Sequence, residues 1–88
     1  MDPTEIVAID AAHIWHPYAE PGQFPYPVAS ARGTRIRLFA GTALIDAMSS
    51  WWSVIHGHSN PRLVAAAQDQ IGQMSHVMFG GLTHAPAA

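Results

Sequence analysis

Residues 28–47 have the sequence VASARGTRIRLFAGTALIDA, and this stretch decides the expected fold. Within it, residues 35–38 alternate polar and apolar side chains, which is the two-residue period of a half-buried β-strand. The dipeptides Arg32-Gly33 and Ala40-Gly41 flank this strand and signal turns on both sides. Such short turns favour antiparallel pairing of neighbouring strands, so the sequence predicts a small three-stranded antiparallel sheet. The predicted strands cover residues 28–31, 35–38 and 42–45.

A helix and a proline-rich arm are expected before the sheet. Residues 3–16 carry an amphipathic stripe at helical spacing, and Pro17 disfavours helix in the residue before it. The stripe consists of Ile6, Ile9 and His13. Residues 17–27 contain four prolines and a glycine, which exclude a helix or a central strand and favour an extended path.

A second helix is expected after the sheet, over residues 60–78. Asn60 is a natural N-cap, and Pro61 suits the first helical position. Gly80 and Gly81 follow and could end the helix, because glycine adopts positive φ freely. Alternatively, the bare backbone of this pair could approach an anion or a neighbouring chain closely. The predicted segment is therefore of the α+β class, in the order helix, arm, sheet, helix.

Composition excludes several classes of protein. The chain has 88 residues, 49% hydrophobic and 11% charged, with no cysteine and a net charge of −2, so we expect one domain at most. Its four cations are all arginine, which leaves no basic stripe for nucleic acid. It has no run of 18 apolar residues for a membrane span and no positively charged start for a signal peptide, so we expect a cytoplasmic protein. A compact fold of this mass would expose ~5,000 Å².

Histidines and tryptophans are the candidates for chemistry. Two adjacent tryptophans, Trp51 and Trp52, would point to opposite faces of a strand, one toward the core and one toward a cleft. Among the histidines, His13 and His16 are expected near one helix face, but the spacings match no zinc signature. We therefore expect packing or hydrogen-bonding histidines and no metal site. The six histidines are His13, His16, His56, His58, His76 and His84.

Four stretches together carry a resemblance that spans nearly the whole chain. They are residues 13–18 (HIWHPY), 46–52 (DAMSSWW), 55–58 with 60–61 (IHGH and NP), and 74–86 (MSHVMFGGLTHAP). In this order they resemble the N-terminal segment of the adenosylmethionine-8-amino-7-oxononanoate aminotransferases, which are class III pyridoxal-phosphate enzymes of biotin biosynthesis. The resemblance implies a fold-type I homodimer, α/β when complete, whose large cofactor domain lies outside these 88 residues.

The resemblance also implies a reaction and a set of site residues. S-adenosylmethionine would donate an amino group through pyridoxal 5'-phosphate to 8-amino-7-oxononanoate, giving 7,8-diaminononanoate. Tyr18 and Trp51 match residues that line the substrate site, and Trp52 is a weaker candidate beside them. Gly80 and Gly81 match a loop near the partner subunit's active site. No catalytic residue is expected here, and the chain contains no lysine to hold the cofactor, so we expect it to be inactive alone and part of a longer enzyme.

Three alternatives remain open at this level. One is another class III aminotransferase, acting on ω-amino acids. Another is a small histidine-rich metal-binding module. The third is a non-catalytic interaction domain that pairs through its sheet and tryptophans.

Overall fold

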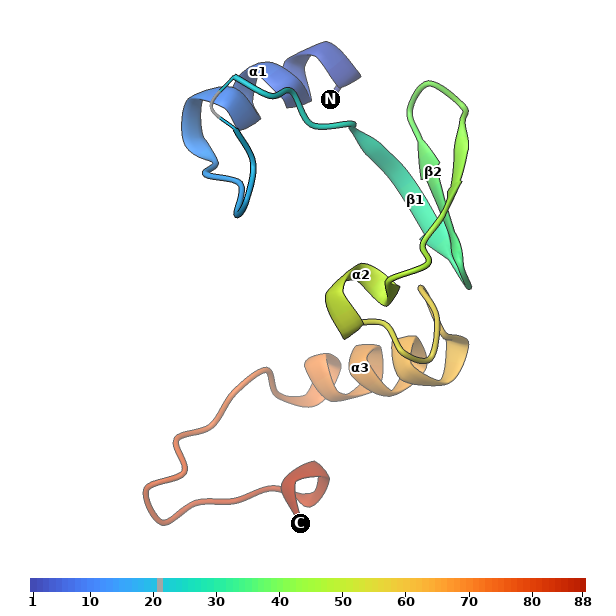
Figure 1. Ribbon diagram of the computed structural model, residues 1–88. Helices are drawn as coiled ribbons and strands as arrows, with labels where there is room; N and C mark the ends of the chain where they lie inside the picture. The colour runs from blue at the N-terminus through green and yellow to red at the C-terminus, as the bar shows by residue number, and fades with distance from the viewer. Residues whose placement is uncertain (21) are drawn as a thin grey trace. The chain divides into compact units, whose positions relative to one another are not determined.

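The computed structural model describes residues 1–20 and 22–88, and Figure 1 shows the course of the chain. The chain divides into two compact units, Met1–His58 and Ser59–Ala88. The first contains a helix, an irregular arm, a sheet and a short turn, and the second contains a helix and an irregular tail. The predicted α+β class and the predicted order of elements are confirmed.

The sheet has three antiparallel strands in the order β1-β2-β3. They are β1 (Val28–Arg32), β2 (Arg35–Leu38) and β3 (Ala43–Ile45). Ile36 of β2 lies opposite Ala31 on one side and Leu44 on the other, so apolar side chains align across all three strands. The alternation of residues 35–38 thus predicted the strand, and the structure supplies its register, which shifts between Val28 and Ser30 of β1.

The first helix, α1 (Pro3–His13), ends earlier than expected. Its start is capped by Asp2, whose Oδ1 accepts a hydrogen bond from the Glu5 N–H at 2.9 Å. The predicted end at residue 16 is wrong, because Ile14 is already extended, with φ −112° and ψ 130°. The chain leaves the helix here, and the His16 ring reaches back to Asp10, with Nε2 2.7 Å from Oδ2.

The predicted stripe on α1 is also wrong. Ile6, Val7 and Asp10 are the half-buried residues of the helix, whereas Ile9 and His13 are exposed. Since the helix stops at His13, the expected pairing of two histidines on one helix face does not occur. The described part of the arm, residues 17–20 and 22–27, contains neither helix nor strand, as predicted.

The second unit begins with α3 (Pro61–Gln73), which is shorter than predicted. Asn60 caps it as expected, since its Oδ1 accepts from the N–H groups of Arg62 at 3.0 Å and Leu63 at 3.4 Å. The predicted end at residue 78 is wrong. Met74 is extended, and its carbonyl accepts a hydrogen bond from the Gln70 side-chain amide at 3.0 Å. Poor helix formers follow Met74, beginning with serine, histidine and valine. A 3₁₀ turn, η1 (Ala85–Ala87), closes the chain.

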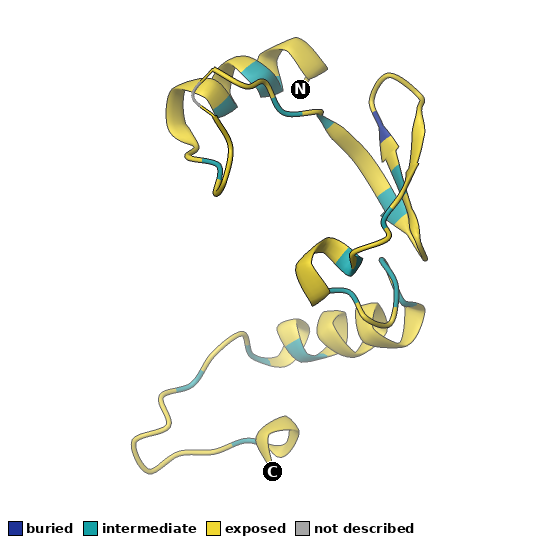
Figure 2. Cartoon of the chain, viewed as in Figure 1, coloured by how far each residue is buried: buried dark blue, intermediate teal, exposed yellow. Residues whose placement is uncertain are grey.

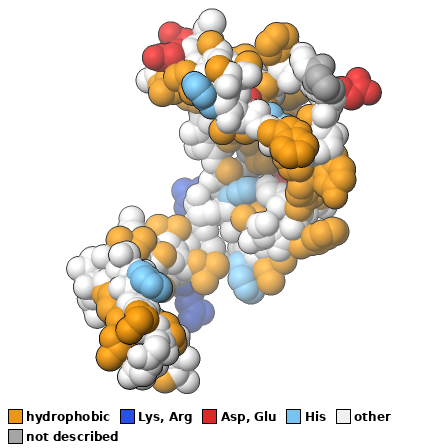
Figure 3. Space-filling view, turned by 90° about the vertical axis from the view of Figure 1, so that its left-hand side faces the viewer, with side chains coloured by type: hydrophobic (Ala, Val, Ile, Leu, Met, Phe, Trp, Pro, Cys, Tyr) orange, Lys and Arg blue, Asp and Glu red, His pale blue; other side chains and the backbone are white. Residues whose placement is uncertain are grey.

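The described residues form almost no hydrophobic core. Only Leu38 of β2 is buried among them, and Figure 2 shows most of the ribbon as exposed. The accessible surface is 7553 Å², about half as much again as the ~5,000 Å² expected for a compact chain of this mass. In the space-filling view of Figure 3, hydrophobic side chains are spread over the surface. Within residues 1–20 and 22–88, no helix has the length and apolar character needed to cross a membrane.

Candidate functional site

The structure brings together two of the predicted site residues, Tyr18 and Trp51. Their rings meet edge to face, with centroids 5.7 Å apart and planes at 72°. Tyr18 is 98% exposed and Trp51 is 50% exposed, so both rings remain open to a ligand. Trp52, the weaker candidate, is 79% exposed. An aromatic pair with this much free surface can hold flat or apolar molecules.

The two tryptophans do not lie on a strand, so the expectation of opposite strand faces is wrong. They end the short element α2 (Ser49–Trp52), whose residues all have positive φ. The φ angles are 50°, 45°, 57° and 64° from Ser49 to Trp52. A left-handed residue other than glycine costs about 1–2 kcal/mol relative to the right-handed form. Four in succession need compensating contacts, and such strain is found at functional sites.

The Asp46 carboxylate supplies the main contacts to this turn. Its Oδ1 accepts a hydrogen bond from the Ser50 N–H at 3.0 Å, and its Oδ2 accepts from the Ser50 hydroxyl at 2.7 Å. The His58 Nε2 donates to the same Oδ2 at 2.7 Å. The side chains of Asp46 and His58 are 8% and 16% exposed, whereas Ser50 lies at the surface. We call Asp46, Ser50 and His58 the Asp46 cluster.

The backbone attaches both ends of the Asp46 cluster to the β1–β2 hairpin. The Asp46 N–H donates to the Thr34 carbonyl at 2.9 Å. His58 and Gly33 exchange two backbone hydrogen bonds, of 2.8 and 2.9 Å. Gly57 lies against the same place, since a Cβ added to it would be 3.2 Å from the Gly33 Cα. The hairpin therefore sets where the carboxylate and the imidazole meet.

We expect Gly57→Ala to destabilise a folded protein that contains this segment by at least ~1 kcal/mol. Gly57 has φ +81°, and its new methyl group would also crowd the Gly33 backbone. Gly41→Ala is the matched control, because Gly41 has φ +89° but no atom near the added Cβ. Urea unfolding of both variants measures the difference. Equal losses would show that the contact between the two glycines adds nothing.

The hydrogen bonds to Asp46 lower its pKa from 3.8 to about 2, with the Ser50 N–H as the largest cause. The Ser50 hydroxyl and the His58 ring act in the same direction. A carboxyl group with a lowered folded-state pKa stabilises the fold above its unfolded pKa. This contribution disappears as the pH falls through the folded-state pKa.

The contribution of Asp46 to stability is therefore expected to be complete above pH ~4 and lost as the pH falls toward ~2. The measurement is the free energy of unfolding against pH, for a folded protein with Asp46 and for its Asp46→Asn variant. The difference between the two curves should shrink over this interval, because asparagine does not titrate. A difference that stays constant down to pH 2 would contradict the lowered pKa.

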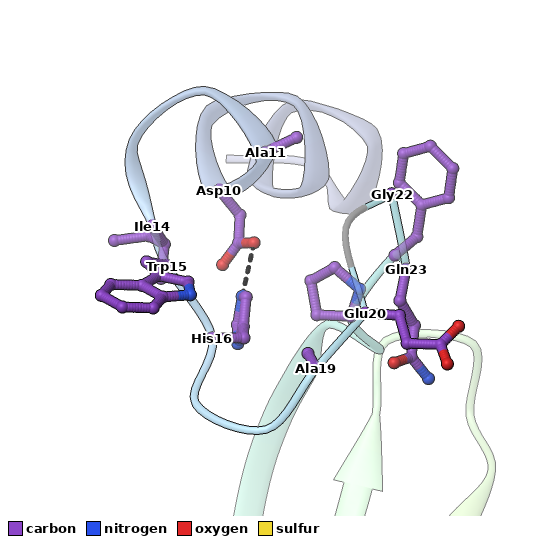
Figure 4. Close-up of a pocket in the computed structure, with 11 residues that line it drawn as sticks. Asp10, Ala11, Ile14, Trp15, His16, Ala19, Glu20, Gly22 and Gln23 are labelled. Carbon is purple, nitrogen blue, oxygen red and sulfur yellow. Dashed lines mark hydrogen bonds and ion pairs between the residues drawn. The ribbon is translucent and has the colours of Figure 1, made fainter.

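A separate pocket lies in the N-terminal arm. It has a volume of about 290 Å³, and Figure 4 shows the Asp10–His16 interaction on its wall. Ile14, Trp15 and Phe24 add apolar surface. The carboxylate of Asp10 and the imidazole of His16 bind each other there, and Glu20 adds a second carboxylate to the lining.

The remaining predicted site residues, Gly80 and Gly81, belong to the second unit. The prediction that they stop a helix is wrong, because α3 has ended well before them. Gly81 has φ +90°, and its N–H donates to the Phe79 carbonyl at 3.0 Å. A Cβ on Gly80 would meet the Met78 side chain at ordinary distances of 3.5 Å or more. The pair therefore forms a bend in an irregular segment. Position 81 favours glycine because of its positive φ.

The Asp46 cluster is not among the sites predicted from the sequence. Its signals were visible in the sequence: an isolated acid at the end of a predicted strand, a serine four residues later, and a histidine beyond. Nothing in their spacing showed that the intervening backbone is left-handed. Within the part of the chain that the structure describes, no three histidine, aspartate or glutamate side chains are grouped as metal ligands would be.

Comparison with known proteins shows which family this chain resembles. The model of the aminotransferase class-III family matches residues 18–88. An adenosylmethionine-8-amino-7-oxononanoate aminotransferase of Corynebacterium glutamicum is 56% identical over 87 residues, and one of Buchnera aphidicola subsp. Baizongia pistaciae is 58% identical over 81. These matches cover 99% and 89% of this chain but only 21% and 19% of the relatives, so the chain spans about a fifth of their length.

The fold agrees with that result. A crystal structure of adenosylmethionine-8-amino-7-oxononanoate aminotransferase from Methanocaldococcus jannaschii is similar with a TM-score of 0.86 and 24% identity. The similarity covers 98% of this chain and 20% of that one. The fold of this segment is thus a known one, and with the family match over residues 18–88 the chain belongs to the class-III aminotransferase family.

Proposed function

We propose that this chain is the N-terminal segment of a cytoplasmic, homodimeric transaminase of biotin biosynthesis. In this proposal the enzyme transfers an amino group from S-adenosylmethionine to 8-amino-7-oxononanoate. The large domain that binds pyridoxal 5'-phosphate lies in the rest of the enzyme. Relatives named for this reaction, at 56% and 58% identity, support the choice of substrates.

The exposed pair of Tyr18 and Trp51 is the observation that carries the proposal. S-adenosylmethionine has a flat adenine and a sulfonium cation, and both interact favourably with aromatic rings. The acceptor 8-amino-7-oxononanoate has a long apolar chain that an indole can cover. The Tyr18 hydroxyl can add a directional hydrogen bond to either substrate. We assign Tyr18 and Trp51, with Trp52 beside them, to the substrate wall.

The covalent attachment of the cofactor is assigned to the rest of the enzyme. The sequence has no lysine, so it offers no side-chain amine to bind pyridoxal 5'-phosphate covalently. The carboxylate of Asp46 and the ring of His58 are committed to each other. When bound, the cofactor supplies the electron sink for amino-group transfer. In the proposed enzyme, this chain binds and orients substrates, and the bend at Gly80 and Gly81 lies toward the partner subunit's active site.

A hybrid enzyme tests the proposal. Residues 1–88 replace the matching segment of the Corynebacterium glutamicum relative, which supplies the remaining four-fifths of the protein. We expect the hybrid to form 7,8-diaminononanoate with S-adenosylmethionine as donor. The unmodified relative is the positive control.

The choice of amino donor separates this function from the nearest alternative. A hybrid that folds and accepts ω-amino acids but not S-adenosylmethionine would overturn the proposed substrates in favour of a different class III aminotransferase. A hybrid that folds but accepts neither donor would overturn the assignment of this segment to the substrate wall.

A further inference from the structure

The ring of Trp51 depends for its position on a turn that is unfavourable by itself. All four residues of α2 have left-handed φ, and none of them is glycine. The backbone bonds at its ends, from the Trp52 N–H to the Met48 carbonyl and from the Val54 N–H to the Ser49 carbonyl, are each 3.1 Å. These two bonds close the turn. The Ser50 N–H and hydroxyl, inside the turn, bond to other groups.

Those partners are the two carboxylate oxygens of Asp46. One oxygen accepts from the Ser50 N–H and the other from its hydroxyl, so the residue before Trp51 is held at two points. Bonds to an ionised acceptor are stronger than neutral ones. The lowered pKa of Asp46 is consistent with an acceptor that stays ionised.

The His58 ring prevents the carboxylate from turning away. Its Nε2 donates to the oxygen that also accepts from the Ser50 hydroxyl, and it lies 3.5 Å from that hydroxyl. The His58 backbone is in turn bonded to Gly33 of the hairpin through both its N–H and its carbonyl. A continuous series of bonds therefore links the sheet, through His58 and Asp46, to Ser50.

We propose that Asp46 and His58 are positioning residues whose hydrogen bond holds α2 in its left-handed form and thereby fixes the Trp51 ring beside Tyr18. They act on substrate binding through Trp51 and contact no reacting atom. This inference rests on the proposed function, because it is the substrate wall that they position.

A double-mutant cycle in the hybrid enzyme is the test. We expect Asp46→Asn to raise KM for both substrates at least ~5-fold, since it weakens charge-assisted bonds to Ser50. In a Trp51→Ala background the same change should leave KM nearly unaltered, because the ring it positions is gone. Asp69→Asn is the matched control, because Asp69 is exposed on α3, accepts a hydrogen bond from the Gln73 side chain and lies outside the Asp46 cluster, so it should not change KM.

Variants at His58 provide a second test of the positioning role, which does not require the Asp46→Asn variant to fold. His58→Ala should raise KM, and His58→Gln, which keeps a side-chain N–H donor, should restore part of the loss. Equal KM effects of Asp46→Asn with and without Trp51 would overturn the proposal, as would unchanged KM values in both Asp46→Asn and His58→Ala.

A spectroscopic readout separates this inference from the proposed function. The near-ultraviolet circular dichroism of the folded hybrid contains a contribution from the Tyr18–Trp51 pair, which Trp51→Ala removes. Asp46→Asn should remove the same contribution, whichever amino donor the enzyme accepts. If S-adenosylmethionine fails as donor but this signal is lost, the substrates are wrong and the positioning role stands. If the donor works and the signal persists in Asp46→Asn, the positioning role is wrong.

Discussion

Replacing Trp51 by alanine in the hybrid enzyme is expected to raise KM for both substrates by about 5- to 150-fold. The indole is half exposed and stands edge to face with Tyr18, so its free face is available to a ligand. Losing an aromatic contact surface of this kind costs about 1–3 kcal/mol. Steady-state kinetics with each substrate varied in turn measures the effect.

The cofactor should be retained in this variant, because no residue of this chain is assigned to it. The absorbance of bound pyridoxal phosphate after gel filtration checks that point. Trp51→Phe should lie between the parent and Trp51→Ala, since it keeps a smaller ring. Trp15→Ala is the control, because Trp15 lines the arm pocket and is not part of the Tyr18–Trp51 pair, so KM should be unchanged. Unchanged KM for both substrates in Trp51→Ala would remove Trp51 from the substrate wall.

The 88-residue chain by itself is expected to show no cooperative unfolding transition and no transaminase activity. Only Leu38 is buried among the described residues, so the hydrophobic term that balances conformational entropy is largely missing. Without cysteine there is no disulfide to constrain the unfolded chain, and without lysine there is no amine to hold the cofactor. Circular dichroism against urea, compared with the hybrid enzyme, measures the first expectation.

The isolated chain exposes apolar side chains that the rest of the enzyme is expected to cover in the hybrid. Three large aromatic side chains are each at least 77% exposed, namely Trp15, Tyr18 and Tyr26. In a self-contained domain, few large side chains are exposed to this extent. A dye that binds exposed apolar surface should therefore bind the isolated chain more strongly than the hybrid. A sharp urea transition with weak dye binding would show instead that the segment is an independent domain.

Local signals predicted much of the fold. The alternation in residues 35–38 predicted β2, because side chains on a strand point to opposite faces in turn. Asn60 and Pro61 predicted the start of α3, because a cap depends on a few neighbouring atoms. The four quoted stretches predicted the family, which the match over residues 18–88 confirmed.

The ends of the helices needed the tertiary structure. Expected ends at residues 16 and 78 were inferred from Pro17 and from Gly80-Gly81, which are strong local signals. The helices end earlier, where side chains of Asp10 and Gln70 bond to groups beyond the last turn. Several weak local preferences compete at a helix end, so a single side-chain hydrogen bond can move it.

The sequence by itself determined the three strands and the N-cap of α3, because each depends on residues close together in the chain, and it determined the family through four short stretches. Only the tertiary structure decided the left-handed turn at Trp51 and its meeting with Tyr18. Non-glycine residues rarely adopt positive φ, so local preference argues against that turn. It exists because Asp46 and His58, 12 residues apart, meet on the hairpin and bond Ser50. Contacts of this kind form only after the chain has folded back on itself, and no short pattern encodes them.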